Sequence, residues 1–256
     1  MTSAVTPSLS VRDLTIRFGG HVAVNAVTAD FYPGQLTVIV GPNGAGKTTC
    51  FNLMSGQLPA TSGQVLLYGQ DITKFGPAKR TRLGIGRAFQ LTNLFPHLTV
   101  LENVRLVVQS HAGQGLNMWS VWFRHKELLA RAEHYLERVS MQDRRHTIVA
   151  ALSHGDKRKL EVALLLALEP DVLMFDEPTA GMSVDEVPVV LDLIHQVKTD
   201  TDKTVLLVEH KMDVVRSLAD RIVVLHNGTL VADGEPAEVM ASSIVQEAYL
   251  GVPAHA

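Results

Sequence analysis

A glycine-rich segment at residues 41–49 (GPNGAGKTT) directly follows the apolar run LTVIV at 36–40. It matches the pattern G-x-x-x-x-G-K-[ST] of a phosphate-binding loop. Small residues allow backbone N–H groups to surround phosphate oxygens without Cβ clashes, and a helix that starts behind the loop adds the partial positive charge of its N-terminus. The stretch from the lysine onward has a helix-like composition. The segment therefore predicts a strand, a phosphate-binding turn and a helix in immediate succession.

Four continuous apolar runs predict strands that are buried on both faces. They lie at 36–40, 172–175, 204–208 and 222–225, and stretches with helical periodicity lie at 126–139, 159–168 and 187–198. Such strands are typical of a parallel sheet covered by helices, and their alternation with helices indicates an α/β fold. The segments 9–18 and 63–72 alternate between apolar and polar residues, which favours antiparallel strands. The stretch 91–159 has no strong strand signal and predicts a mostly helical insertion.

The composition excludes several classes of protein. Of the 256 residues, 46% are hydrophobic and 19% are charged, which is typical of a globular chain with a sizeable core. The single cysteine, Cys50, excludes an intramolecular disulfide, and we expect it to be inert packing in a reducing compartment. No apolar run approaches the roughly 20 residues of a membrane-spanning helix, and the first residues lack the features of a signal peptide. A net charge of −3 does not favour a dedicated nucleic-acid binder. We therefore expect a cytosolic chain, unless a partner holds it at a membrane.

Two acidic residues end another predicted strand. Asp176 and Glu177 directly follow the apolar run 172–175, and open α/β sheets bind ligands beyond the carboxyl ends of their strands. Combined with the phosphate-binding loop, this placement predicts phosphoryl-transfer chemistry. Lys47 would reach the β- and γ-phosphates, and the Thr48 hydroxyl would ligate Mg²⁺. Asp176 would complete the Mg²⁺ shell, and Glu177 would polarise the attacking water.

The order of these motifs resembles that of ATP-binding cassette (ABC) ATPases. The loop at 41–49 is followed by a glutamine in GRAFQ, by LSHGDKRKLEVALLLALEPDVLMFDEPTAG and by LLVEH, and the resemblance covers residues 9–250. It implies a P-loop NTPase fold with a RecA-like parallel-sheet core, an N-terminal antiparallel β subdomain and a helical subdomain. The whole chain, 1–256, would be one ABC ATPase domain. Its core and β subdomain would occupy 9–90 and 160–230, its helical subdomain 91–159, and a C-terminal tail 231–256.

The resemblance also implies cofactors and roles for single residues. ATP and Mg²⁺ would be the cofactors, and a dimer would sandwich two ATP molecules. Gln90 matches the glutamine that touches Mg²⁺ and the attacking water, and His210 matches the switch histidine that contacts the γ-phosphate. Together with Glu177 they form the expected catalytic set, and Thr48, Gln90 and Asp176 form the expected Mg²⁺ ligands. The expected nucleotide contacts are Phe18, which would stack on adenine, Val24, Gly41, Pro42, Asn43, Gly44, Ala45, Gly46, Lys47, Thr48, Thr49, Ser153 and Gly155.

The signature segment departs from the family pattern. Residues 152–156 read LSHGD, whereas the family's usual sequence is LSGGQ. Ser153 and Gly155 keep a hydroxyl and a close backbone approach at the start of a helix expected at 157–168, where they would contact the γ-phosphate of ATP held by the opposite protomer. Asp156 would place an acid near that phosphate, although the basic residues 157–159 lie close enough to offset it. An inactive signature, and with it a regulatory protein that binds nucleotide without turnover, is the alternative.

Further stretches resemble the ATP-binding subunits of branched-chain amino-acid importers, of the LivG type. They are FGGHVAV, GRAFQLTNLFPHLTVLENV, TAGMSVDE and VADGEPAEVMASSIVQEAYLG. The resemblance implies two integral membrane permease subunits, a second ABC ATPase subunit in a hetero- or homodimer, and indirectly a solute-binding protein. The chain would then lie on the cytoplasmic side of the inner membrane as a peripheral subunit. Urea and short-chain amide importer ATPases also carry LSHG and are one alternative, and a soluble ABC ATPase outside transport is another.

One segment lies outside these motifs. Residues 116–123 (LNMWSVWF) contain both tryptophans and precede the basic residues Arg124 and Lys126. The segment predicts either an amphipathic stretch packed within the helical insertion or a contact with membrane subunits or lipid headgroups.

Overall fold

The computed structural model describes residues 5–88, 94–113, 126–183, 185–199, 202–243 and 245. A four-stranded sheet contains β1 (Leu9–Phe18), β2 (His21–Phe31), β4 (Ser62–Leu67) and β5 (Gln70–Asp71). A six-stranded sheet contains β3 (Leu36–Val40), β6 (Ile85–Ala88), β7 (Val172–Asp176), β8 (Thr204–Val208), β9 (Arg221–His226) and β10 (Thr229–Gly234). The strand orders are β2-β1-β4-β5 and β10-β9-β3-β8-β7-β6.

The central parallel strands of the six-stranded sheet are buried on both faces. Strands β9, β3, β8, β7 and β6 are parallel, and only β10 is antiparallel to its neighbour. Alternate residues of one strand enter different hydrophobic clusters: Leu173 and Phe175 of β7 pack into one, whereas Val172 and Met174 pack into the other. Because successive side chains of a strand point to opposite faces of the sheet, a strand that is buried on both faces needs apolar residues at its odd and its even positions. This alternation explains the continuous apolar runs.

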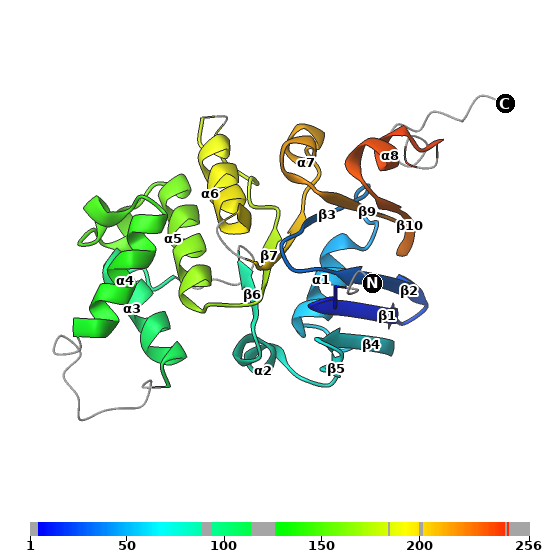
Figure 1. The fold of residues 1–256 in the computed structure, drawn as a ribbon, viewed down its shortest axis with the longest axis horizontal. Helices are drawn as coiled ribbons and strands as arrows, with labels where there is room; N and C mark the ends of the chain where they lie inside the picture. Colours follow the sequence, from blue (N-terminus) through cyan, green and yellow to red (C-terminus); the bar gives the residue numbers. More distant parts are fainter. Residues whose placement is uncertain are drawn as a thin grey trace.

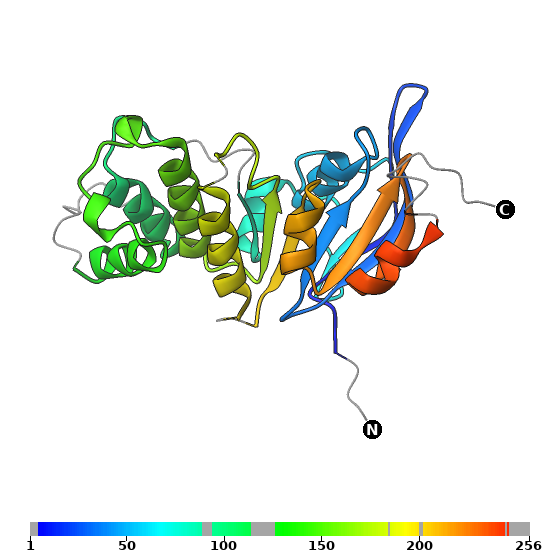
Figure 2. The same cartoon turned by 90° about the horizontal axis from the view of Figure 1, so that it is seen from above.

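The helices are α1 (Lys47–Ser55), α2 (Pro77–Arg82), α3 (Val100–His111), α4 (Lys126–Arg138), α5 (His154–Ala167), α6 (Val187–Thr199), α7 (Met212–Leu218) and α8 (Pro236–Ala241), with short 3₁₀ turns at Gln142–Arg144 and Val149–Ala151. Figures 1 and 2 show α3, α4 and α5 together at one end of the molecule and the four-stranded sheet at the other. Helix α1 packs in the cluster between the two sheets, and α3 to α7 contribute to the cluster on the other face. Among the helices that the structure describes, none combines the length and the apolar character needed to span a membrane.

The strand and helix predictions are largely confirmed. The four apolar runs are the parallel strands β3, β7, β8 and β9, and the alternating segments form antiparallel β1, β4 and β5. The expectations are incomplete in two respects. Several elements were not predicted, namely strands β2, β6 and β10 and the short helices α2, α7 and α8; β6 (IGRA), for example, includes a glycine and an arginine in its four residues and forms no apolar run. Helix α5 begins at His154, earlier than expected, because the Ser153 side chain accepts a hydrogen bond from the Asp156 N–H and caps the helix.

Candidate functional site

The phosphate-binding loop bends sharply between β3 and α1, and two glycines make this possible. Gly41 has φ +156°, and a Cβ there would lie 2.1 Å from the Leu225 carbonyl oxygen. Gly46 has φ +95°, and a Cβ there would lie 2.5 Å from the Ala23 carbonyl oxygen. Helix α1 then starts at Lys47 with no acidic residue in its first turn and, among the described residues, no side-chain cap. The N-terminus of α1 is therefore suited to an anion.

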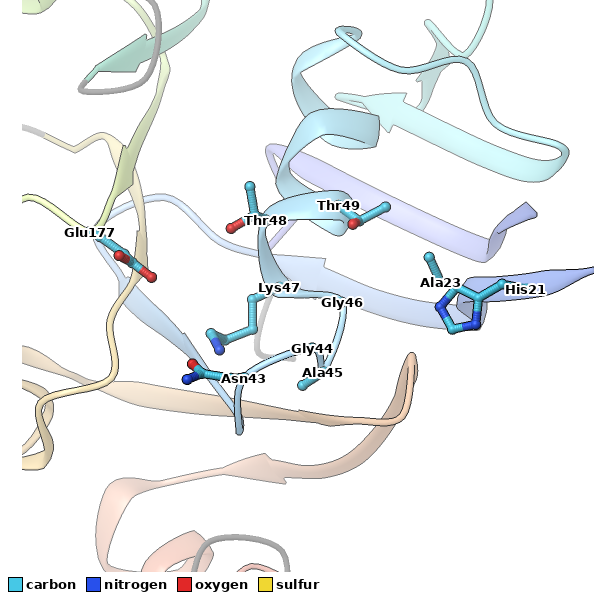
Figure 3. Close-up of a pocket in the computed structure, with 10 residues that line it drawn as sticks. All are labelled: His21, Ala23, Asn43, Gly44, Ala45, Gly46, Lys47, Thr48, Thr49 and Glu177. Atoms are coloured by element: carbon cyan, nitrogen blue, oxygen red, sulfur yellow. The ribbon is translucent and has the colours of Figure 1, made fainter. Parts of the chain in front are cut away.

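A pocket of about 340 Å³ opens over this loop. It is lined by His21, Ala23, Asn43, Gly44, Ala45, Gly46, Lys47, Thr48, Thr49 and Glu177. Figure 3 shows Glu177 on one side of the loop and His21 on the other, so the pocket extends from the carboxyl end of β7 to the start of β2. The structure thus places seven of the nine predicted loop residues in the lining of one cavity.

Lys47 brings a positive charge to this pocket. Its side chain curls back over the loop, and its Nζ donates hydrogen bonds to the carbonyl oxygens of Gly41 and Pro42 at 2.7 and 3.0 Å. Burial lowers the pKa of the ammonium group, and the Glu177 and Asp176 carboxylates oppose that shift. A phosphate group would supply stronger acceptors than two carbonyls, since charge-assisted hydrogen bonds are the stronger kind.

Asp176 lies at the end of β7 in a buried ion pair. Its Oδ2 accepts a hydrogen bond from the Arg87 guanidinium at 2.6 Å, and the side chains are 1% and 6% exposed. Burial raises the pKa of Asp176, while Arg87 opposes the shift. The other oxygen, Oδ1, is buried and has no hydrogen-bond partner among the described residues. A buried carboxylate oxygen without a partner fits a Mg²⁺ ion or one of its water ligands, because Mg²⁺ binds through one or two carboxylates together with phosphate oxygens.

Glu177 and His210 face each other at the same edge of the sheet. The His210 Nδ1 lies 3.9 Å from the Glu177 Oε1, and both side chains are partly exposed, at 49% and 40%. Glu177 adopts φ +47°, a left-handed conformation that costs a non-glycine residue about 1–3 kcal/mol. Its N–H donates to the Val208 carbonyl at 3.0 Å, which ties this conformation to β8. The strained backbone aims the carboxylate into the pocket.

The loop that carries His210 is held by a buried acid that sequence reasoning missed. Glu209 is fully buried and accepts hydrogen bonds from the backbone N–H groups of His210 and Lys211, at 2.8 and 3.1 Å. Its other oxygen accepts a hydrogen bond from the Thr179 hydroxyl, just beyond Glu177. Glu209 therefore links the loops after β7 and β8. The only signal in the sequence was an acid between an apolar strand and the predicted histidine.

The signature residues lie at the N-terminus of α5, away from the pocket lining. Ser153 and His154 are exposed and Gly155 is buried. The Gly155 N–H donates to Glu186 Oε1 at 3.1 Å, and Glu186 Oε2 accepts from the N–H and the hydroxyl of Ser183. These hydrogen bonds lower the pKa of Glu186. Glu186 therefore joins the starts of α5 and α6, and neither it nor Ser183 was predicted.

Lys159 Nζ lies 4.0 Å from Asp156 Oδ1, so one of the three expected basic residues reaches this acid.

The remaining predicted residues are less closely grouped. Phe18, at the end of β1, is 50% exposed, as an aromatic side chain that stacks on a ligand would be, although it does not line the pocket. Val24 is fully buried. Gln90 and the tryptophan-containing segment 116–123 lie outside the described residues. His21 and Ala23 line the pocket but were not predicted, because only the packing of β2 against the loop, where the Ala23 carbonyl lies beside Gly46, brings them there.

Comparisons with known proteins agree with this geometry. The ABC transporter family model matches residues 24–180. The chain is 37% identical to the high-affinity branched-chain amino acid transport ATP-binding protein LivG of Escherichia coli (strain K12), over 96% of the chain and 98% of that protein. It is equally similar, at 37% identity and the same coverage, to BraF of Pseudomonas aeruginosa, which has the same description. Among solved structures, the ADP conformation of an ATP-binding cassette of an ABC transporter matches with a TM-score of 0.83 and 27% identity, over 96% of this chain and 99% of that one.

Proposed function

Because the chain belongs to the ABC transporter family, we propose that it is the ATP-hydrolysing subunit of an importer for branched-chain amino acids. The observation that carries the proposal is the meeting of the phosphate-binding loop, the Asp176–Glu177 pair and His210 at one edge of the parallel sheet. The substrate class rests on the names of relatives that cover almost the whole chain. ABC transporter ATPases bind ATP and hydrolyse it to ADP and phosphate.

The residues suggest a division of work during hydrolysis. The loop amides and Lys47 bind the phosphates, and the Thr48 hydroxyl and Asp176 hold the Mg²⁺ that neutralises phosphate charge when bound. Glu177 accepts the proton of the attacking water, whose oxygen bonds to the γ-phosphorus as the bond to ADP breaks. His210 lies beside Glu177 and donates a hydrogen bond to the γ-phosphoryl group. Gln90 is proposed to contact Mg²⁺ and the same water.

A second ATPase subunit would complete the site. Ser153 and His154 are exposed at the N-terminus of α5, where a phosphate of the partner's ATP can approach. The partner is either a second copy or a related chain. Its own signature segment would face the pocket over residues 43–49.

The membrane subunits have a candidate contact at Phe95. This side chain is 54% exposed, while its backbone is clamped by the buried Asn103, whose side chain accepts from the Phe95 N–H at 2.9 Å and donates to its carbonyl at 3.2 Å. An exposed aromatic side chain on a backbone that is fixed by hydrogen bonds is suited to act as a binding anchor. We propose that a permease subunit docks here and that the two permease subunits of the complex hold the chain at the cytoplasmic face of the inner membrane, with a solute-binding protein acting through them.

The proposal is tested by assembly and transport. The tagged chain, pulled down from mildly solubilised membranes, should bring two polytopic membrane subunits and an ATPase subunit. Reconstituted into liposomes with the matching binding protein, the complex should hydrolyse ATP faster with leucine, isoleucine or valine than with urea or acetamide. Stimulation by urea or acetamide alone would contradict the substrate class. Soluble partners alone, with none of the chain in the membrane fraction, would contradict the transporter itself.

A further inference from the structure

The guanidinium group of one arginine on β6 links that strand to β7 and to α1. Arg87, on the edge strand β6, donates from Nη2 to Asp176 Oδ2 on β7 at 2.6 Å. From Nη1 it donates to Asn52 Oδ1 at 2.7 Å and to Ser55 Oγ at 2.9 Å, both on α1. The strand that carries Asp176 and the helix that follows the phosphate-binding loop are therefore bound to the same side chain.

The geometry at Arg87 is that of a fixed ion pair. Both partners are almost completely buried, and a buried pair is strongly destabilised when one partner is removed, because an uncompensated charge remains. The planar fork of an arginine can satisfy a carboxylate and two further acceptors at once, whereas the ammonium group of a lysine acts as a point charge. The orientation of Asp176 therefore depends on the planar shape of the guanidinium group as well as on its positive charge.

Of the two proposed Mg²⁺ ligands of the described chain, Asp176 is bound directly by this fork, and Thr48 lies on the helix that the fork holds. Asp176 uses Oδ2 for Arg87, which leaves Oδ1 as the oxygen without a partner among the described residues. On α1, Thr48, Asn52 and Ser55 are spaced four and three residues apart, so they lie on one face of the helix. Arg87 therefore sets the position of the Asp176 carboxylate relative to the helix face that carries Thr48.

We propose that Arg87 is a positioning residue for the magnesium site. It orients the free oxygen of Asp176 and keeps that oxygen at a fixed position relative to Thr48. The inference rests on the proposed binding of Mg·ATP. It assigns a function to the arginine of GRAFQ, a residue that does not line the nucleotide pocket. Residues that orient metal ligands typically change metal affinity about 10–100-fold when they are substituted.

The test is the Mg²⁺ dependence of nucleotide binding by the full chain, measured by titration with a fluorescent N-methylanthraniloyl ATP in Mg²⁺ or in EDTA. The gain in affinity that Mg²⁺ provides should fall about tenfold in Arg87→Lys, while the affinity in EDTA stays within twofold. Asn52→Ala removes one anchor of the fork and leaves the buried pair in place. It should lower the Mg²⁺ gain in the same direction by a smaller factor, even if Arg87→Lys folds poorly.

Arg80→Lys is the matched control. Arg80 is also buried, at 2% exposure, but its guanidinium donates to backbone carbonyls, including those of Leu53 and Met54 at the end of α1. Its substitution should lower the melting temperature without changing the gain in nucleotide affinity that Mg²⁺ provides.

On an Asp176→Asn background, Arg87→Lys should have no further effect on this gain, because the two residues act as a unit.

The outcomes separate the two proposals. The positioning role would be overturned if Mg²⁺ increased nucleotide affinity in Arg87→Lys and Asn52→Ala as much as in the unsubstituted chain. A larger increase would also overturn it, because Arg87 would then be a cation that competes with Mg²⁺. If Arg80→Lys lost as much of the Mg²⁺-dependent affinity as Arg87→Lys, general destabilisation would explain the effect, and the positioning role would again be overturned. An unsubstituted chain that binds no nucleotide, with or without Mg²⁺, would overturn the proposed function as well.

Discussion

At the scale of single residues, the proposed catalytic groups at the edge of the parallel sheet depend on side chains that are held by buried partners. Asp176 is held by Arg87, and the His210 loop is held by Glu209. Both partners lie within quoted motifs, GRAFQ and LLVEH, but the sequence analysis assigned a role to neither. A buried charge is retained only when it is paired or hydrogen-bonded, so these partners determine where the reactive groups lie.

Glu177→Gln should abolish turnover while ATP still binds. The substitution keeps the size of the side chain but removes the group that accepts the proton of water, and loss of one such group costs on the order of 10²–10³ in rate. Phosphate release measured for the reconstituted complex should fall by that factor, and ATP should hold the ATPase subunits together as a dimer. Glu137→Gln, on exposed surface of α4, is a control that should leave turnover unchanged. Normal turnover in Glu177→Gln would remove Glu177 from the mechanism.

Cys50 should be unreactive in the folded protein. It is 2% exposed on α1, and burial raises the pKa of its thiol to about 12. Because the thiolate is the reactive form, a thiol reagent at pH 8 should label the native chain far more slowly than the chain in denaturant. Cys50→Ala, which contains no other cysteine, gives the background. Rapid stoichiometric labelling of the native chain would contradict the expected role of Cys50 as inert packing.

At the scale of elements, α3 and α5 begin where a side chain caps them. Helix α3 has a complete capping box, in which the Thr99 hydroxyl accepts from the Glu102 N–H and Glu102 accepts from the Thr99 N–H. The reciprocal pair fixes the start of α3 just after the segment that presents Phe95. Sequence periodicity predicts the body of a helix well, whereas its first residue depends on such local hydrogen bonds.

Thr99→Ala should destabilise the protein by about 1 kcal/mol, since that is the typical cost of losing an N-cap side chain. Urea unfolding, followed by circular dichroism, should show the midpoint shifted to lower urea with an unchanged slope. Thr99→Ser keeps the hydroxyl and should lie close to the unsubstituted chain. Equal losses in Thr99→Ala and Thr99→Ser would attribute the effect to the methyl group and not to the cap.

At the scale of the whole molecule, two hydrophobic clusters divide the protein. One lies between the parallel sheet, α1 and the four-stranded sheet, and the other joins the opposite face of the parallel sheet to α3 to α7. The nucleotide pocket lies at the end of the first cluster, whereas Phe95 and the α5 N-terminus belong to the side of the second. The proposed membrane contact therefore lies beside the helical cluster, and the ATP pocket lies at the carboxyl edge of the parallel sheet, next to the other cluster.

Phe95→Ala should weaken attachment to the membrane subunits without affecting nucleotide binding. The exposed ring contributes little to the core, so its removal should leave the melting temperature nearly unchanged, whereas an anchor of an interface typically costs about 2 kcal/mol or more of binding. Co-purification of the membrane subunits should fall, and affinity for ATP should stay the same. Tyr68→Ala, at an exposed aromatic residue next to β4 in the other sheet, is the matched control. An equal fall in both variants would argue against a specific contact at Phe95.

The sequence by itself determined the local features of this protein. The apolar runs of β3, β7, β8 and β9 predicted parallel strands because both faces of each must be buried, and the glycines of 41–49 predicted the phosphate loop because its backbone excludes larger side chains. Only the tertiary structure decided which distant residues meet: Arg87 with Asp176, Glu186 with Gly155, and His21 with the loop. The physical reason is that burial and periodicity are properties of one segment. A hydrogen bond between side chains on different strands or helices depends instead on how those elements pack.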